Sequence, residues 1–156
     1  MTDQLSSQYG PLTRGIIQGI YNIKKSIYNP VLFCGKTEIT SGICAEIAHH
    51  FIDIGQKVSW VTADEFTQML VDALMFRKYN DFRNMLFPCD VLIIENVETL
   101  SGRASTQEEF YYLFDRVYEN NSQIILSSLM SPNLITNLED RVKTQLMAGI
   151  YCRVDE

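Results

Sequence analysis

The chain has 156 residues, of which 46% are apolar and 21% are charged, and its formal net charge is −6. This length and composition are typical of one globular domain, and no apolar run approaches the roughly 18 residues that a membrane span needs. The acidic balance argues against broad, non-specific binding to nucleic acid. The first residues have neither a basic region nor an apolar core, so we expect no secretory signal.

No repeat or long linker interrupts the chain, so we expect a flexible N-terminus at 1–11 and a single domain at 12–156. The four cysteines lack C-x-x-C spacing, and we therefore expect neither a zinc site nor secretion but a reducing cytoplasm. The adjacent His49 and His50 would point about 100° apart on a helix, which disfavours a shared metal.

The first predicted helix, 12–28, has apolar residues at Ile16, Ile20, Ile23 and Ile27 and ends before Pro30. Short apolar runs then predict strands at 31–34, 57–62, 90–95 and 123–127, with a possible fifth strand at 149–154.

Helical patterns separate these strands. They cover 41–54, which ends at Gly55, then 63–75, 79–86 and 107–120. Pro132 opens a further segment toward 138–147. We expect Thr106 to cap the helix at 107–120, with Glu109 completing a capping box. Alternating strands and helices predict a parallel sheet covered on both faces, with ligands beyond the carboxyl ends of its strands.

The stretch after the first strand, GKTEITSG at 35–42, invites comparison with a phosphate-binding loop. Such a loop has the pattern G-x-x-x-x-G-K-[ST], but Thr40, Ser41 and Gly42 occupy the positions of its second glycine, lysine and hydroxyl residue. If Gly35, Lys36 and Thr37 form the end of the pattern, the first glycine falls on Pro30. In that register we expect the tripeptide to lie before the turn rather than at the start of the helix.

The strand at 90–95 ends in Glu95 and Asn96. A nucleotide hydrolase usually has an aspartate near Mg²⁺ and a carboxylate that orients water at such a place. The extra methylene of Glu95 changes its reach, and Asn96 can position a water molecule but cannot act as its base.

Several stretches together resemble the AAA+ domain of the bacterial replication initiator DnaA and its shorter relatives. They are Asn29-Pro30, DVLIIEN at 90–96, TQEEFYYLFDRVYENNSQIILSS at 106–128 and LEDRVK at 138–143. The resemblance implies a three-layer αβα sandwich with a five-stranded parallel sheet. We expect no counterpart of the family's helical lid or of its duplex-binding domain.

Carried over by position, 35–42 matches the Walker A loop and Glu95-Asn96 the end of Walker B. Leu129 stands where the family has a polar sensor residue, Arg141 matches an arginine at a subunit-facing edge, and Gln145 replaces the arginine finger. Glutamine cannot supply the cation that stabilises a transferred phosphate.

The resemblance also bears on nucleic acid, since the family binds single-stranded DNA through the helical pair that 63–75 resembles. A family arginine before the next helix is replaced by Ser105, with Arg103 nearby. Possible nucleic-acid contacts are Arg77, Lys78, Arg83 and Arg103, and the acidic balance counts against them.

The favoured interpretation is therefore a non-catalytic DnaA-like module without cofactor or metal. It would contact DnaA, another AAA+ replication protein or a second copy of itself, with no membrane and doubtful nucleic-acid contact. One alternative is an ATPase that uses Lys36 and Glu95 with ATP and Mg²⁺, and another is a single-stranded DNA-binding module. Gln4-Leu5 faintly resembles the start of a motif by which short DnaA relatives bind the sliding clamp.

Overall fold

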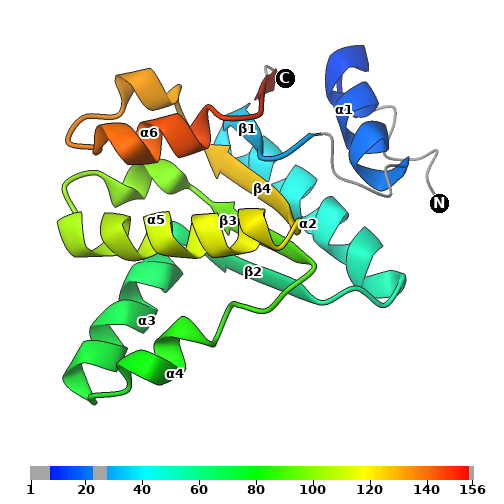
Figure 1. Ribbon diagram of the computed structural model, residues 1–156. Helices are drawn as coiled ribbons and strands as arrows, with labels where there is room; N and C mark the ends of the chain where they lie inside the picture. The colour runs from blue at the N-terminus through cyan, green and yellow to red at the C-terminus, as the bar shows by residue number, and fades with distance from the viewer. Residues whose placement is uncertain (1–7, 23–27, 155–156) are drawn as a thin grey trace.

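The computed structural model describes residues 8–22 and 28–154, and its core is a sheet of five parallel strands. The strands lie in the order β2-β3-β4-β1-β5 (Figure 1). Their bounds are Val31–Gly35 for β1, Val58–Thr62 for β2, Val91–Glu95 for β3, Gln123–Ser128 for β4 and Ile150–Val154 for β5. The predicted five-stranded parallel sheet is confirmed.

Helices cover both faces of the sheet. They are α1 (Pro11–Asn22), α2 (Thr37–Asp53), α3 (Ala63–Met75), α4 (Tyr79–Arg83), α5 (Ala104–Glu119) and α6 (Asp140–Leu146), with short 3₁₀ helices η1 (Val97–Leu100) and η2 (Pro132–Leu134). The sandwich predicted from the resemblance is therefore confirmed.

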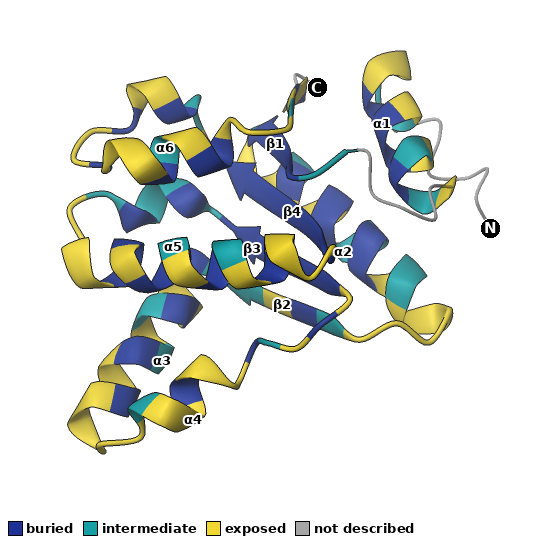
Figure 2. Cartoon of the chain, in the orientation of Figure 1, coloured by how far each residue is buried: buried dark blue, intermediate teal, exposed yellow. Residues whose placement is uncertain are grey.

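Two apolar clusters fill the space between these layers. Because side chains alternate along a strand, Ile93 faces α1 and α2, whereas Leu92 and Ile94 face the layer of α3, α5 and α6. Figure 2 shows the buried strands between the two helical layers, with the hairpin of α3 and α4 extending away from the sheet. The central strands β3 and β4 are buried along their whole length, as the apolar runs at 91–94 and 124–126 predict, and the polar ends of β4 are buried with them.

Several predicted boundaries were wrong. The helix expected at 41–54 begins at Thr37, because the Lys36 carbonyl already accepts hydrogen bonds from the amides of Ile39 and Thr40. The helix expected at 79–86 ends at Arg83. The segment at 138–147, for which no element type was predicted, contains α6 at Asp140–Leu146. Gly55 follows α2 with a positive φ of 85°, as expected for a glycine after a helix.

The capping box was predicted on the wrong helix. The helix α5 begins at Ala104, so Thr106 lies inside it and is buried, and Glu109 accepts a hydrogen bond from Tyr79. The capping box occurs instead at Thr62 and Glu65, at the start of α3.

The N-terminal segment also differs from the expectation. Tyr9, within the segment expected to be flexible, packs against the apolar cluster of α1 and α2. Ile16 and Ile20 face that cluster as predicted, whereas Ile23 and Ile27 lie outside the described residues.

Candidate functional site at the carboxyl ends of the strands

The candidate site lies where β1, β3 and β4 end at the same edge of the sheet. Phe33 pairs with Ser127 and Cys34 with Ser128, so the end of β1 lies beside the end of β4. After β1 the chain continues to β2, at the far edge of the sheet. The last strand, β5, lies beside β1 on the side opposite β4. Such a reversal of strand order is where ligands bind in open α/β sheets.

The junction between β1 and α2 is very short. Only Lys36 stands between Gly35, the last residue of β1, and Thr37, the first residue of α2. The tripeptide Gly35-Lys36-Thr37 thus lies at the start of the helix, and the expectation that it precedes the turn was wrong. The Lys36 side chain is exposed at this helix N-terminus.

Gly35 has a structural reason to be glycine. A Cβ at this position would overlap the carbonyl oxygen of Val154 in the neighbouring strand β5. Packing of β1 against β5 therefore explains this glycine without any phosphate.

The positions matched to the rest of the phosphate loop are helical. Thr40, Ser41 and Gly42 lie in the first turns of α2, and Thr40 is buried with its hydroxyl 3.4 Å from the Thr37 carbonyl oxygen. A Cβ on Gly42 would meet only the Tyr9 hydroxyl, at 3.4 Å. In this structure, residues 37–42 do not form a loop.

Glu95, at the end of β3, has a protein partner. Its side chain is only 7% exposed, and its Oε2 accepts a hydrogen bond of 2.7 Å from Nε1 of Trp60 in the edge strand β2. Burial, with a smaller contribution from the nearby Glu95 carboxylate, raises the pKa of the Cys44 thiol. Trp60 was missed by sequence reasoning, because its contact with Glu95 depends on the register of β2 against β3, in which Trp60 pairs with Ile93 and Thr62 with Glu95.

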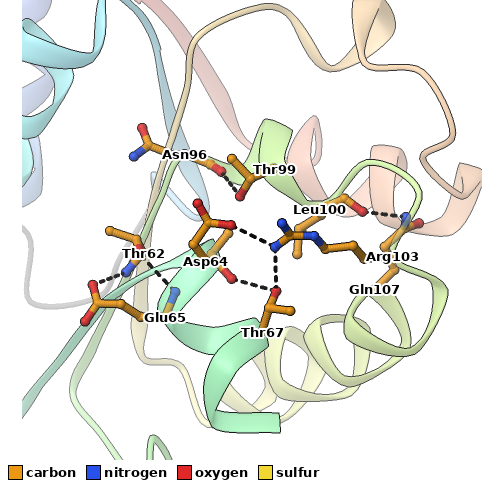
Figure 3. Close-up of polar contacts among 10 residues, drawn as sticks. Thr62, Asp64, Glu65, Thr67, Asn96, Thr99, Leu100, Arg103 and Gln107 are labelled. Atoms are coloured by element: carbon orange, nitrogen blue, oxygen red, sulfur yellow. Dashed lines mark hydrogen bonds and ion pairs between the residues drawn. The ribbon is translucent and has the colours of Figure 1, made fainter. Parts of the chain in front are cut away.

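Asn96 takes a left-handed backbone conformation, with φ of 59°. Its amide donates to the Ser127 hydroxyl at 2.9 Å. Its carbonyl accepts from the Thr99 hydroxyl at 2.9 Å (Figure 3). Its backbone therefore joins the ends of β3 and β4. Leu129, at the sensor position, is 49% exposed.

Glu98, in η1, is a second residue that the sequence did not single out. Its Oε2 is buried and has no hydrogen-bond partner, and burial raises the pKa of the carboxyl group. Its signal in the sequence is weak, because a carboxylate three residues beyond a strand is common.

The basic residues considered for nucleic acid do not form one patch. Arg103, which precedes α5, donates to the Asp64 carboxylate at 2.7 Å and lies 3.2 Å from the Thr67 hydroxyl in α3 (Figure 3). Arg77 and Lys78 are exposed between α3 and α4.

Arg83 is occupied by its neighbours. It contacts the Tyr79 hydroxyl at 2.7 Å and Glu109 at 3.6 Å, and its guanidinium lies 4.8 Å from the Tyr79 ring centroid. The hydrogen bond that Arg83 donates to the Tyr79 hydroxyl raises the pKa of Arg83, so the group keeps its charge.

The two residues considered for subunit or partner contact lie in different environments. Arg141 is exposed, pairs with Glu139 at 2.9 Å and covers the Tyr111 ring at 4.4 Å. Gln145 is only 6% exposed and donates to the Tyr111 carbonyl and the Asp115 carboxylate, between α5 and α6. The expectation of a Gln145 contact with a partner therefore does not fit this position.

The remaining sequence-based expectations concern the clamp motif, the cysteines, a metal site and a membrane span. Gln4 and Leu5 lie outside the described residues. Within 8–22 and 28–154, no group of three or more His, Cys, Asp and Glu side chains could hold a metal ion, and the four cysteines are buried free thiols. In the same residues, no helix is long and apolar enough to cross a membrane.

Comparison with known proteins places this arrangement in a family. Residues 12–153 match the family described as the bacterial DnaA ATPase domain. The chain belongs to this family. The chromosomal replication initiator protein DnaA of Helicobacter acinonychis is 33% identical over 143 residues, which are 86% of this chain and 32% of that protein. The chain thus spans about a third of the length of this relative.

Solved structures of the family have the same fold. An AMPPCP-bound DnaA from Aquifex aeolicus has a TM-score of 0.89 at 28% identity, covering 95% of this chain and 47% of that one. A replication initiator DnaA bound to AMPPCP and single-stranded DNA also has a TM-score of 0.89 at 28% identity, with 96% and 47% covered. The predicted DnaA-like AAA+ fold is confirmed.

Proposed function

We propose that this chain is a DnaA-like module that does not hydrolyse ATP and acts through protein contacts in bacterial DNA replication initiation or its regulation. A cytoplasmic location is part of the proposal. The observation that carries it is the single-residue junction at Lys36 between β1 and α2.

A phosphate loop works because several free backbone amides surround the phosphates. Here the amides of Ile39 and Thr40 both donate to the Lys36 carbonyl at 3.0 Å, so the first turn of α2 has used them. The residues that would form a loop are part of the helix instead. This geometry supports the loss of tight nucleotide binding.

The metal side of the site supports the same proposal. A Mg²⁺ ion ligated by both carboxylate oxygens of Glu95 would compete with the hydrogen bond from Trp60 to Oε2 and leave the indole N–H without that partner. The Asn96 side chain is neutral and cannot replace the charge of the Glu95 carboxylate. Gln145 is buried and neutral, and thus supplies no cation to a neighbouring nucleotide.

Nucleotide binding through Lys36 is a second candidate, favoured by one observation. Lys36 is exposed at the N-terminus of a helix of 17 residues, where the helix dipole favours anions. In this version ATP and Mg²⁺ would be held without an extended loop.

Isothermal titration with Mg²⁺ and ATP distinguishes these two candidates. We expect no saturable heat with ATP concentrations up to the millimolar range. Micromolar binding that Lys36→Ala removes would overturn the proposal and establish the second candidate. The matched control is Lys57→Ala, which removes another exposed lysine, just before β2, and keeps the charge change the same.

A further inference from the structure

A groove of about 470 Å³ runs between α4 and α5, on the face of the sheet opposite α2 (Figure 1). Below it lies a smaller cavity of about 40 Å³, whose apolar lining is Phe66, Phe82, Leu86 and Leu113. The two spaces share the lining residues Arg83, Glu109, Tyr112 and Arg116, so the cavity forms the floor of the groove. An apolar floor below a polar rim is the usual composition of a protein-binding surface.

The rim of the groove carries a stripe of carboxylates along α5. Glu108, Tyr112, Asp115 and Glu119 follow each other every three or four residues, so they lie on one side of the helix. Glu108 and Glu119 are exposed, and neither takes part in an ion pair within residues 8–22 and 28–154. Asp115 accepts a hydrogen bond of 3.1 Å from the Gln145 amide, which is neutral and leaves the charge of the carboxylate in place.

The two arginines of the groove do not balance this stripe. Arg83 lies 3.6 Å from the Glu109 carboxylate, so these two charges offset each other. Arg116 donates to the Arg83 carbonyl at 3.1 Å and lies 4.6 Å from the Phe87 ring centroid, and it faces the carboxylates of Glu108, Asp115 and Glu119 alone. The groove therefore keeps an excess of negative charge and matches a cationic ligand.

Tyr112 adds an aromatic surface in the middle of the stripe. Its ring centroid lies 5.8 Å from the Arg83 guanidinium, and the residue is 42% exposed. An exposed aromatic ring attracts the guanidinium or ammonium group of a ligand, and carboxylates on both sides strengthen that attraction.

We propose that the α4–α5 groove binds a basic segment of a partner protein. One apolar side chain of the segment fills the floor cavity, and its arginine or lysine side chains lie over Tyr112 and the carboxylate stripe. From Glu108 to Glu119 the stripe spans eleven residues of α5, or about 16 Å, which three turns of a helical segment would cover. The same carboxylates repel the phosphates of a nucleic acid, so a basic protein segment is the ligand that fits.

The inference gives the proposed protein contacts a surface, but its test is independent of ATP. None of the groove residues lies at the junction of β1 and α2 or at the ends of β3 and β4. A chain that binds ATP would overturn the proposed function and leave the groove unaffected, whereas a groove that binds no basic peptide would leave the ATP result unaffected.

Fluorescence anisotropy with the full chain tests the groove. The probe is a fluorescein-labelled helical peptide with four arginines, spaced four, three and four residues apart to match the stripe, and one leucine between the central pair. We expect saturable binding in the micromolar range that weakens as salt is added. Glu108→Lys with Glu119→Lys should weaken binding about tenfold or more, and Tyr112→Ala about two- to fivefold.

A matched control separates the groove from the net charge of the chain. Glu38→Lys with Asp53→Lys makes the same charge change at exposed positions of α2 and should bind the peptide as the unmodified chain does. A second peptide, with glycine in place of the leucine, tests the floor cavity and should bind several-fold more weakly. Circular dichroism establishes that each variant is folded.

Four outcomes would overturn the proposal. The unmodified chain could fail to bind the peptide at millimolar concentrations, the groove variant could bind it as tightly as the unmodified chain, or the α2 control could lose binding to the same extent. The peptide without leucine could also bind equally well, which would leave the cavity without a role.

Discussion

Nε1 of Trp60 donates a hydrogen bond of 2.7 Å to Oε2 of Glu95, and this bond joins the edge strand β2 to the end of β3. The indole N–H is an uncharged donor to the buried Glu95 carboxylate. This carboxylate lies at the strand end where a nucleotide hydrolase holds its metal. The contact therefore ties the edge strand of the sheet to the end of β3.

Replacing Trp60 by phenylalanine tests the value of this bond. The variant keeps an aromatic ring but leaves Glu95 without its donor in a buried position, so we expect a loss of about 1 to 3 kcal/mol of unfolding free energy. Urea unfolding measures it. Adding Glu95→Leu to Trp60→Phe removes the unpaired carboxylate, and the double variant should recover part of the loss. Equal stability of Trp60→Phe and the unmodified chain would show that the bond contributes little.

The two glycines of the apparent phosphate loop should respond in opposite ways to alanine. Gly35→Ala places a methyl group against the Val154 carbonyl, and we expect a loss of about 1 to 3 kcal/mol. Gly42→Ala lies inside α2 and meets only the Tyr9 hydroxyl, at 3.4 Å, so helix propensity should raise stability by about 0.5 to 1 kcal/mol. Thermal unfolding of both variants checks this, and a stabilising Gly35→Ala would contradict the packing argument.

Glu46, in α2, should make the stability of the domain depend on pH. Its Oε2 is buried without a hydrogen-bond partner, and burial raises the pKa of its carboxyl group. A carboxyl with a raised folded-state pKa contributes stability below its ordinary pKa and loses it as pH rises through the raised value. We expect Glu46→Gln to raise the melting temperature by about 1 to 3 °C at pH 7.

The same variant should gain nothing at pH 4 and below, where the native carboxyl is already neutral. Glu108→Gln, on the exposed side of α5, is the matched control and should leave the midpoint unchanged at both pH values. A gain from Glu46→Gln that persists at low pH would point to an effect other than ionisation.

Arg103 and Asp64 should be coupled only weakly. Their ion pair joins the starts of α5 and α3, but the side chains are 41% and 63% exposed. We expect Arg103→Ala and Asp64→Ala each to cost less than about 1 kcal/mol, and salt should reduce the cost. A double-mutant cycle measures the coupling, and a value above this range would indicate a stronger structural role for the pair.

The sequence alone determined the layers of this protein. Its alternation of short apolar runs with helical periodicity predicted the five parallel strands, because a fully buried strand must be apolar on both faces, as Val91–Ile94 are. The same pattern placed Glu95 and Lys36 at one edge of the sheet, since the carboxyl ends of parallel strands lie together.

Only the tertiary structure decided what the side chains at that edge do. In the first turn of α2, backbone amides donate hydrogen bonds to the Lys36 carbonyl. The residue types in this stretch do not predict these bonds. Trp60 reaches Glu95, and Gln145 turns inward to Asp115, because strand register and helix packing bring together residues 35 and 30 positions apart. Such contacts depend on the mutual orientation of packed elements, which local periodicity does not encode.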